Sequence, residues 1–322
     1  MSYQHQHCNC GHDHEHEHDH EHEEIQGMDY DHPQPDKFHQ AFNQFGPAEK
    51  DDMVTKKAND IIEAEFKDNF NDKVLKKIHG FIDLTSLTSL DTRESILKMV
   101  DKVNDFEGTS PEIPNVAAIC VYPIFVSTVK QGLTAANVNI AAVSGGFPAS
   151  QTFTEVKIAE TSLCVSDGAD EIDVVMNLGY LLEDDFEAIS DELNEIKESC
   201  REAKLKVILE TGAIATAANI WKASICALYS GADFLKTSTG KGYPGASIEA
   251  AFVMCEAIKK YYTLTNRKVG LKVAGGIRSA EEAVKYYSIV KSILGEEWLN
   301  KDLFRIGASS LVGDIEHRLG IN

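Results

Sequence analysis

The sequence has no long apolar segment. None of its apolar runs approaches the roughly 18 residues that a membrane-spanning helix requires. Its first residues are rich in His, Asp and Glu, whereas a secretory signal peptide begins with basic and then apolar residues. We therefore expect no membrane partner and a cytoplasmic location.

Basic residues are scarce relative to acidic ones. The chain holds 31 Lys and Arg against 51 Asp and Glu, which gives a formal net charge of -20. Binding to nucleic acid or to an anionic membrane depends on basic patches, so we expect neither kind of partner. An anionic substrate must meet local cations, because the mean field of the protein opposes it.

Cysteine is too sparse for a disulfide framework. Seven Cys occur in 322 residues, and five of them stand in apolar or helical stretches. We expect these five to be buried thiols in a reducing compartment. They are Cys120, Cys164, Cys200, Cys226 and Cys255.

The N-terminal segment has a composition of its own. Residues 5–24 alternate His with Asp or Glu and hold almost no apolar side chain, so they cannot repay the entropy of folding. We interpret residues 1–52 as a disordered tail. Imidazole and thiol groups are ligands for Zn, Ni or Cu, so this tail is a candidate metal-binding segment. Its candidate ligands are His5, His7, Cys8, Cys10, His12, His14, His16, His18, His20 and His22.

Residues 53–322 have the pattern of one α/β domain. A helix is predicted from Lys56 to about Leu75, and short β-branched or apolar runs then alternate with amphipathic stretches. A capping box, Ser279 with Glu282, marks the start of one such stretch. The predicted strands are Ile78–Leu84, Val116–Tyr122, Asn139–Ser144, Glu171–Met176, Lys206–Glu210, Phe234–Ser238, Gly270–Ala274 and Phe304–Gly307.

Eight strand-helix units in roughly 250 residues match a (β/α)₈ TIM barrel. An open doubly wound sheet more often has about five to seven strands and a Gly-rich first turn, and no G-x-G-x-x-G follows the first strand here. The predicted fold is therefore a TIM barrel with an extra N-terminal helix.

Charged residues stand next to apolar ones near the ends of four predicted strands. They are Asp83, Asp173, Lys236 and Lys272. Alternate residues of a barrel strand point inward, and the C-terminal strand ends form the active-site face of this fold. A single strand-end charge could simply be solvated or ion-paired, but two lysines and two aspartates at one mouth favour a catalytic role.

The two lysines are predicted to lie on neighbouring strands. At a separation of about 5 Å, two ammonium groups repel by roughly 3 kcal/mol at an effective dielectric near 20. We therefore expect either Lys236 or Lys272 to be partly neutral near physiological pH. A neutral amine can attack a carbonyl to form an imine, and Asp173 is placed to relay the protons that this reaction needs.

Three loops carry small and hydroxyl residues after strands six to eight. Glycines let backbone N–H groups approach a ligand, and the serines precede a predicted helix, Leu311–Leu319, whose N-terminus favours an anion. Since the last loops of this fold often bind phosphate, we expect a phosphorylated substrate. The candidate binding residues are Thr237, Gly240, Lys241, Gly275, Gly276, Ser309 and Ser310.

Six segments resemble the deoxyribose-phosphate aldolase family, and the resemblance runs from about Ile78 to Leu319. The segments are Ile82–Leu87, Ala117–Pro123, Gly168–Val175, Lys206–Gly212, Gly231–Lys241 and Arg305–Ser310. The resemblance implies reversible cleavage of 2-deoxy-D-ribose 5-phosphate to D-glyceraldehyde 3-phosphate and acetaldehyde. It also implies no cofactor, no metal in the active site and a role in deoxynucleoside catabolism.

The resemblance also assigns roles to single residues. It implies that Lys236 forms the Schiff base, that Lys272 perturbs the pKa of Lys236 and that Asp173 handles protons. Asp83 is implied to contact substrate hydroxyls. The residues that correspond to the phosphate site of the family are Gly240, Lys241, Gly275, Gly276, Ser309 and Ser310.

Several alternatives stay open at this point. The chain ends at Gly320-Ile321-Asn322, without the C-terminal tyrosine of some bacterial members, which would slow turnover if that tyrosine were indispensable. Gly145-Gly146 could widen the pocket for a different sugar phosphate. Glu210 could orient a lysine or merely pair with one.

An alternative function from another class is a metal-binding or scaffolding protein whose barrel has lost its activity. A homodimer is also left open.

Overall fold

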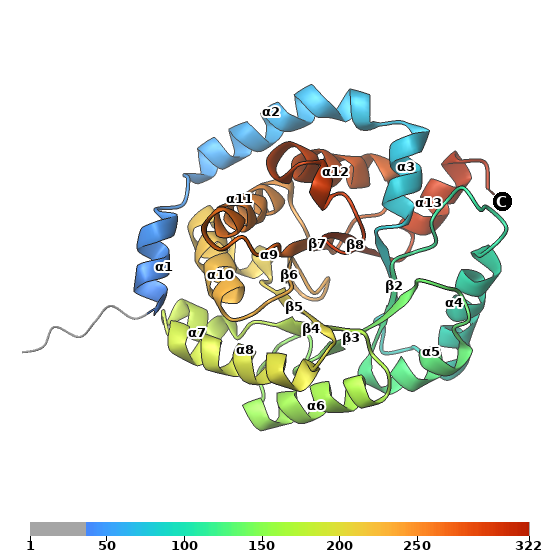
Figure 1. The fold of residues 1–322 in the computed structure, drawn as a ribbon, viewed down its shortest axis with the longest axis horizontal. Helices are drawn as coiled ribbons and strands as arrows, with labels where there is room; N and C mark the ends of the chain where they lie inside the picture. Colours follow the sequence, from blue (N-terminus) through green and yellow to red (C-terminus); the bar gives the residue numbers. More distant parts are fainter. Residues whose placement is uncertain (1–36, 322) are drawn as a thin grey trace, which may run out of the picture. The chain divides into compact units, whose positions relative to one another are not determined.

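The strands form a closed parallel barrel in sequence order. The computed structural model describes residues 37–321. Each strand pairs with the next, and β8 pairs with β1 to close the sheet, so the predicted TIM barrel is confirmed (Figure 1). The strands are β1 (Ile82–Thr85), β2 (Ala118–Val121), β3 (Asn139–Ser144), β4 (Glu171–Val175), β5 (Lys204–Ile208), β6 (Phe234–Lys236), β7 (Gly270–Ala274) and β8 (Phe304–Ala308).

Helices surround this barrel and cover the outer face of its strands (Figure 1). The α-helices are α1 (Lys37–Phe45), α2 (Asp51–Asn69), α3 (Asp72–His79), α4 (Arg93–Phe106), α5 (Val126–Gly132), α6 (Thr154–Ser166), α7 (Leu178–Leu182), α8 (Phe186–Cys200), α9 (Thr211–Ile214), α10 (Ala217–Tyr229), α11 (Ile248–Thr265), α12 (Ala280–Leu294) and α13 (Leu311–Arg318). Within residues 37–321, the short 3₁₀ helices are η1 (Pro123–Phe125) and η2 (Glu296–Trp298).

The barrel has two kinds of packing. Outward-facing strand residues such as Ile172, Val174 and Leu271 join the large apolar core between the sheet and the helices. Inside the barrel, a small apolar cluster near β2 and β3 includes Cys120 and Val143. Much of the remaining interior is charged, whereas the interior of a typical TIM barrel is filled by layers of branched aliphatic side chains.

The predicted strand positions agree with the structure to different degrees. The predicted ranges Asn139–Ser144 and Gly270–Ala274 coincide with β3 and β7. The predicted first strand begins too early, because Ile78 belongs to α3. The capping box at the start of α12 is present, since Ser279 and Glu282 cap each other's backbone.

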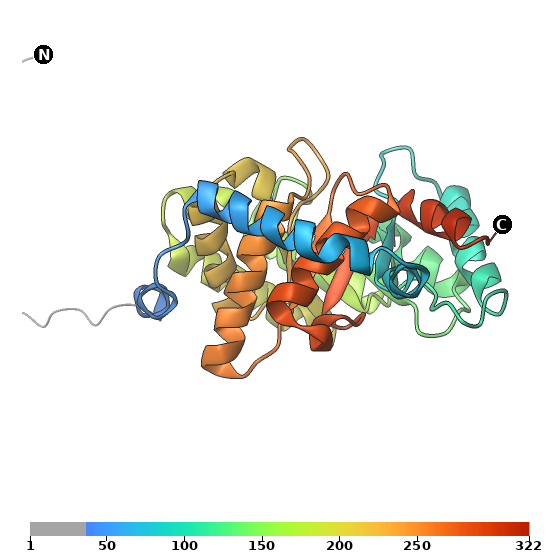
Figure 2. The ribbon, with the colours of Figure 1, turned by 90° about the horizontal axis from the view of Figure 1, so that it is seen from above.

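The N-terminal helical region differs from the prediction of a single helix. The segment predicted as one helix from Lys56 to about Leu75 belongs to two helices, because Phe70-Asn71 interrupts the helical conformation between α2 and α3. The Asn71 side chain caps α3 by accepting a hydrogen bond of 3.1 Å from the Val74 backbone. Figure 2 shows α2 lying across α11 and α12.

The assignment of residues 1–52 to a disordered tail is wrong from residue 37 onward, because α1 lies within that range. Phe38, Ala41 and Phe45 are spaced to share one helix face, and all three are buried. The Trp221 side chain donates a hydrogen bond of 3.0 Å to the Gly46 carbonyl and holds this segment against the barrel domain. The metal-binding prediction concerns residues that lie outside the described part.

The predicted burial of five cysteines is confirmed for the residues that the structure describes. All five cysteines in apolar or helical stretches are buried and free. Across residues 37–321, no helix combines the length and the apolar character needed to cross a membrane.

Candidate active site

Two lysines face one aspartate at the C-terminal ends of the strands. Lys236 on β6 and Lys272 on β7 are register partners on adjacent strands. The Nζ atom of Lys236 lies 2.8 Å from Asp173 Oδ2, and that of Lys272 lies 2.7 Å from the same oxygen. The predicted catalytic residues are therefore brought together, with the β4 carboxylate between the two amines.

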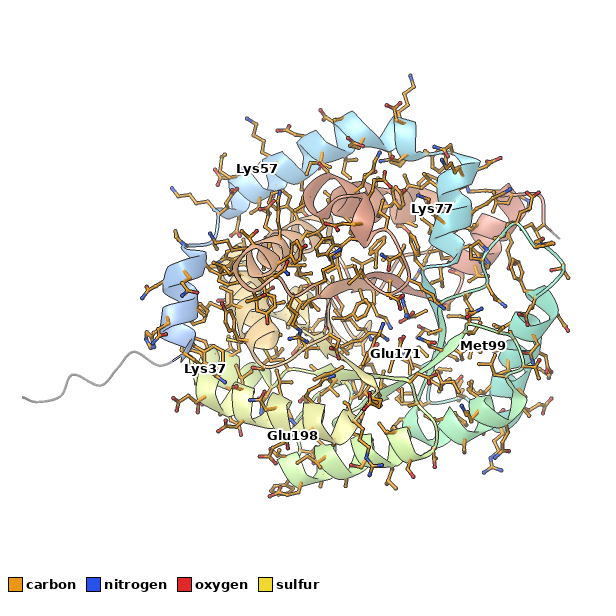
Figure 3. The ribbon with its side chains drawn as sticks, in the orientation of Figure 1. Lys37, Lys57, Lys77, Met99, Glu171 and Glu198 are labelled. Atoms are coloured by element: carbon orange, nitrogen blue, oxygen red, sulfur yellow. The ribbon has the colours of Figure 1, made fainter. Side chains whose placement is uncertain are left out.

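Below this pair lie further charges that the sequence analysis did not identify. Lys206 on β5 donates to Asp173 Oδ1 at 2.9 Å and pairs with Glu171 Oε2 at 2.5 Å. Arg305 on β8 pairs with Asp83 at 2.6 Å and with Glu171 at 2.7 Å. Figure 3 shows Glu171 near the centre of the barrel, whereas the labelled lysines of α2 and α3 lie on the outer ring.

We call these seven side chains the lysine cluster. They are Asp83, Glu171, Asp173, Lys206, Lys236, Lys272 and Arg305, and each is at most 2% exposed. Their sequence signal was available, because Leu205-Lys206-Val207 and Phe304-Arg305-Ile306 also place a charge between two apolar residues. Lys206 and Arg305 were not predicted as site residues, although the same pattern marks them.

The lysine cluster contains one more potential cation than anions. Three carboxylates face four basic groups, and an uncompensated buried charge is costly. Lys206 pairs with three carboxylates and Lys272 with two. Lys236 pairs only with Asp173, which keeps its other partners when Lys236 becomes neutral. Lys236 is therefore the base whose deprotonation costs least.

The pKa shifts agree with this ranking. Burial lowers the pKa of Lys236, and the Lys272 ammonium lowers it further although Asp173 opposes both. Burial also disfavours the charged forms of Lys206 and Lys272, but the facing carboxylates outweigh it and raise the pKa of both amines. Burial would raise the pKa of Asp173, yet the three lysines hold it well below its usual range.

This result changes the explanation that the sequence suggested. Repulsion between Lys236 and Lys272 was expected to produce the neutral amine. Burial is the larger cause of the lowered Lys236 pKa, and the neighbouring ammonium adds to it. Sequence spacing showed that two cations would be close, but it did not show Asp173 between them or the degree of burial.

Lys236 and Lys272 lie at the floor of a cavity of about 350 Å³. Its walls come from the loops after β1, β6, β7 and β8. Of the residues predicted to bind substrate, the cavity is lined by Gly240, Lys241, Gly275, Gly276 and Ser309. Three others do not line it: Ser310 lines the adjoining groove between α4 and α13, and Thr237 and Asp83 are fully buried.

Four backbone amide groups of exposed residues, three that line the cavity and one in the adjoining groove, form what we call the amide rim. They belong to Gly240, Gly276, Ser309 and Ser310. Within residues 37–321, none of these four N–H groups donates a hydrogen bond to the protein. Two of them precede α13, whose N-terminus carries a partial positive charge. The rim therefore offers donors to an anion, with Lys241 beside them.

Two predicted site residues have structural contacts instead. The Thr237 hydroxyl accepts from the Ala274 amide at 2.9 Å and lies 3.1 Å from the Ala274 carbonyl, which ties β6 to β7. Asp83 is enclosed by Arg305, Lys206 and Lys272. With no exposed surface, its carboxylate holds the lysine cluster together.

No lysine of residues 37–321 forms an ion pair with Glu210, so the expectation that it merely pairs with one is wrong. Its two oxygens accept hydrogen bonds from the backbone and hydroxyl of Thr239 at 3.1 and 2.5 Å. Cys120 is fully buried, and burial raises the pKa of its thiol, which agrees with a structural role.

The glycine pair after β3 does not widen the cavity. Gly145 and Gly146 both have a φ of 71°, and neither lines the space above Lys236. A Cβ on Gly145 would lie 2.8 Å from a methyl group of Val174. These glycines are explained by a tight turn against β4.

Comparison with known proteins identifies the family. Residues 81–295 match the family model of the DeoC/LacD family aldolases. The human protein named deoxyribose-phosphate aldolase is 43% identical over 262 residues, covering 76% of this chain and 80% of the relative. The mouse protein of that name is 42% identical over 260 residues, with the same coverage of 76% and 80%.

A solved structure gives the same result. The deoxyribose phosphate aldolase from Aeropyrum pernix, described as having a unique tetrameric structure, superposes with a TM-score of 0.63 at 25% identity. The match covers 81% of this chain and 97% of that one. Because the family model and the curated relatives cover most of the sequence, the chain belongs to the DeoC/LacD family of aldolases.

Proposed function

We propose that this aldolase reversibly cleaves 2-deoxy-D-ribose 5-phosphate to D-glyceraldehyde 3-phosphate and acetaldehyde through a Schiff base on Lys236. The observation that carries the proposal is the position of Lys236. It is the one base of the lysine cluster with a lowered pKa, and it lies at the floor of a cavity that ends in the amide rim. The names of the human and mouse relatives support this substrate.

The reaction begins with the neutral amine. Lys236 attacks C1 of the open-chain sugar, and loss of water from the carbinolamine leaves an iminium ion. The iminium withdraws electrons from C2, so the C2–C3 bond breaks as the C3 hydroxyl loses its proton. The three-carbon phosphate leaves as an aldehyde. The remaining enamine takes a proton at C2, and water then releases acetaldehyde and the free amine.

Asp173 and Lys272 supply the proton transfers in this scheme. Lys272 is the protonated amine beside Lys236, and the Asp173 oxygen between them contacts both. Asp173 relays protons between the amines and the substrate, directly or through an ordered water. Lys206 and Asp83 keep these groups in place from below.

The substrate phosphate binds at the amide rim in this proposal. The N–H groups of the rim and the Lys241 ammonium donate to the phosphate oxygens, and the α13 N-terminus adds a favourable field. Gly275 supports the rim because its backbone lies against Gly245, where a Cβ on Gly275 would come within 2.9 Å of the Gly245 Cα.

Trapping with borohydride tests the proposal. The protein is incubated with acetaldehyde, reduced and digested, and the modified lysine is located by mass spectrometry. We expect an ethyl group on Lys236 and no cleavage of 2-deoxyribose 5-phosphate by Lys236→Met. Lys157→Met is the matched control, because Lys157 is also fully buried but lies outside the cavity. Modification elsewhere with Lys236 untouched would reject the mechanism.

The proposed cellular role is catabolism of deoxynucleoside-derived sugar phosphate in the cytoplasm.

Light scattering of the purified chain tests the homodimer hypothesis, since a larger mass would favour an assembly such as the tetramer described for the Aeropyrum pernix protein.

A further inference from the structure

Glu210 is a buried carboxylate outside the lysine cluster. It is 3% exposed, and no cation of residues 37–321 forms an ion pair with it. Both of its oxygens instead accept from one residue, Thr239, at 3.1 Å from the amide and 2.5 Å from the hydroxyl. Burying a carboxylate with only neutral donors is costly, so this arrangement is not explained by stability alone.

The backbone of Glu210 is also unusual. Its φ of 49° and ψ of 57° lie in the left-handed region, where a long side chain costs roughly 1–3 kcal/mol. The next amide, that of Thr211, donates to the Thr237 carbonyl at 2.9 Å and holds the chain beside β6. This conformation allows the Glu210 side chain to reach the loop that follows β6.

Hydrogen bonds connect Glu210 through Thr239 to the turn that carries part of the amide rim. A carboxylate can only accept hydrogen bonds, so the Thr239 hydroxyl donates to it and keeps its lone pairs for other donors. One lone pair accepts from the Lys241 amide at 3.0 Å. Gly240 lies between these two residues with a φ of 74°, and its N–H belongs to the rim. The negative charge on Glu210 thus makes the Thr239 hydroxyl the donor to Glu210 and the acceptor from the Lys241 amide.

We propose that Glu210 is a positioning residue for phosphate recognition, which holds the turn from Thr239 to Lys241 so that the Gly240 amide and the Lys241 side chain face the phosphate. The proposal rests on the proposed function, because it concerns how the substrate phosphate is bound. Glu210 does not line the cavity and forms no ion pair with the lysine cluster, although the charge of Lys236 acts on it at longer range. It determines the preference for phosphorylated over unphosphorylated sugar and leaves the chemistry at Lys236 unchanged.

Glu210→Gln tests the proposal with little change in shape. The new amide oxygen can still accept from the Thr239 backbone, but the amide nitrogen can only donate, so the bond to the Thr239 hydroxyl is reversed. The hydroxyl proton is then left with the longer contact to the Lys241 carbonyl at 3.2 Å, which alters the turn. We expect kcat/KM for 2-deoxyribose 5-phosphate to fall about tenfold, mostly through KM. The value for 2-deoxyribose without phosphate should change by less than about twofold. Equal losses on both sugars, or unchanged values for both, would overturn the proposal.

A second pair of variants carries the test if Glu210→Gln does not fold. Thr239→Val removes the hydroxyl that links Glu210 to Lys241, and Thr239→Ser retains it. We expect the valine variant to lose the phosphate preference and the serine variant to keep it. Glu192→Gln is the control, because Glu192 is another buried glutamate, 5% exposed, that does not line the cavity. A loss of preference in that control would overturn the assignment.

Binding of inorganic phosphate separates this inference from the proposed function. The dissociation constant is measured by calorimetry for the unmodified protein and for Glu210→Gln. We expect a rise of about tenfold in the variant. This result would support the role of Glu210 even if neither sugar were cleaved, whereas equal constants, or no phosphate binding by the unmodified protein, would overturn it.

Discussion

The lysine cluster and the amide rim meet in one cavity, but the first consists of buried charged side chains and the second of backbone amide groups. The cluster consists of side chains that are almost fully buried and paired with one another. The rim consists of backbone N–H groups of exposed loop residues, and these groups have no partners in the described protein. Burial strengthens the charge interactions that lower the pKa of Lys236, and exposure leaves backbone donors accessible to a ligand. Reactivity and binding are therefore separated within the site.

The largest expected effect comes from removing the nucleophile. Lys236→Met should reduce kcat by at least about a thousandfold, because no other amine in the cluster has a lowered pKa. Cleavage of 2-deoxyribose 5-phosphate in a coupled aldehyde assay measures this. Binding of inorganic phosphate should be retained, because the amide rim is intact. Loss of phosphate binding would show that the two regions are not separable.

An added negative charge at the amide rim should have the next largest effect. Gly276 has a φ of 84°, and a Cβ there would meet no other atom within 4 Å. Gly276→Asp should raise KM for the phosphorylated sugar about a hundredfold by repulsion, with little effect on unphosphorylated 2-deoxyribose. Gly276→Asn is the matched neutral control, since both side chains tolerate this backbone region. Similar kinetics for the two variants would contradict the charge argument.

A smaller effect is expected from changing the balance between cations and carboxylates in the lysine cluster. Lys206→Met removes a cation that competes for Asp173, so the pKa of Lys236 should rise. Because the neutral amine reacts, the acidic limb of the pH profile of kcat/KM should move to higher pH by about one unit. Activity near neutral pH should then fall about tenfold.

A second buried lysine provides the control for that experiment. Lys157 is also fully buried and pairs with Glu192 at 2.7 Å, away from the cavity. Lys157→Met should destabilise the protein by a similar amount, about 3–5 kcal/mol, as denaturant unfolding would measure. Its pH profile should stay where it is. A shift in both variants would assign the effect to general loss of stability.

The smallest effect is expected outside both regions. Deleting residues 1–36 leaves α1 and its packing against Trp221 intact. Both kcat and KM should stay within about twofold of the full-length values, and metal chelators should not change them. A loss of activity on deletion or chelation would favour a functional link between the tail and the cavity.

Much of this site follows from local sequence patterns. The strands that carry Asp173, Lys236 and Lys272 were identified by alternating apolar residues, and the loops of the amide rim by their glycines and serines. These signals depend on neighbours in the chain. The α1 helix was missed although Phe38, Ala41 and Phe45 share a helical spacing, because the polar residues around them dominated the composition of the segment.

The sequence by itself determined the barrel, the lysine-bearing strands and the glycine loops, because periodicity and backbone conformation are local properties. Only the tertiary structure decided which lysine has a lowered pKa and that Glu210 reaches Thr239. Burial and Coulomb energy depend on distances between residues such as Asp83 and Arg305, which are 222 positions apart in the chain and 2.6 Å apart in space.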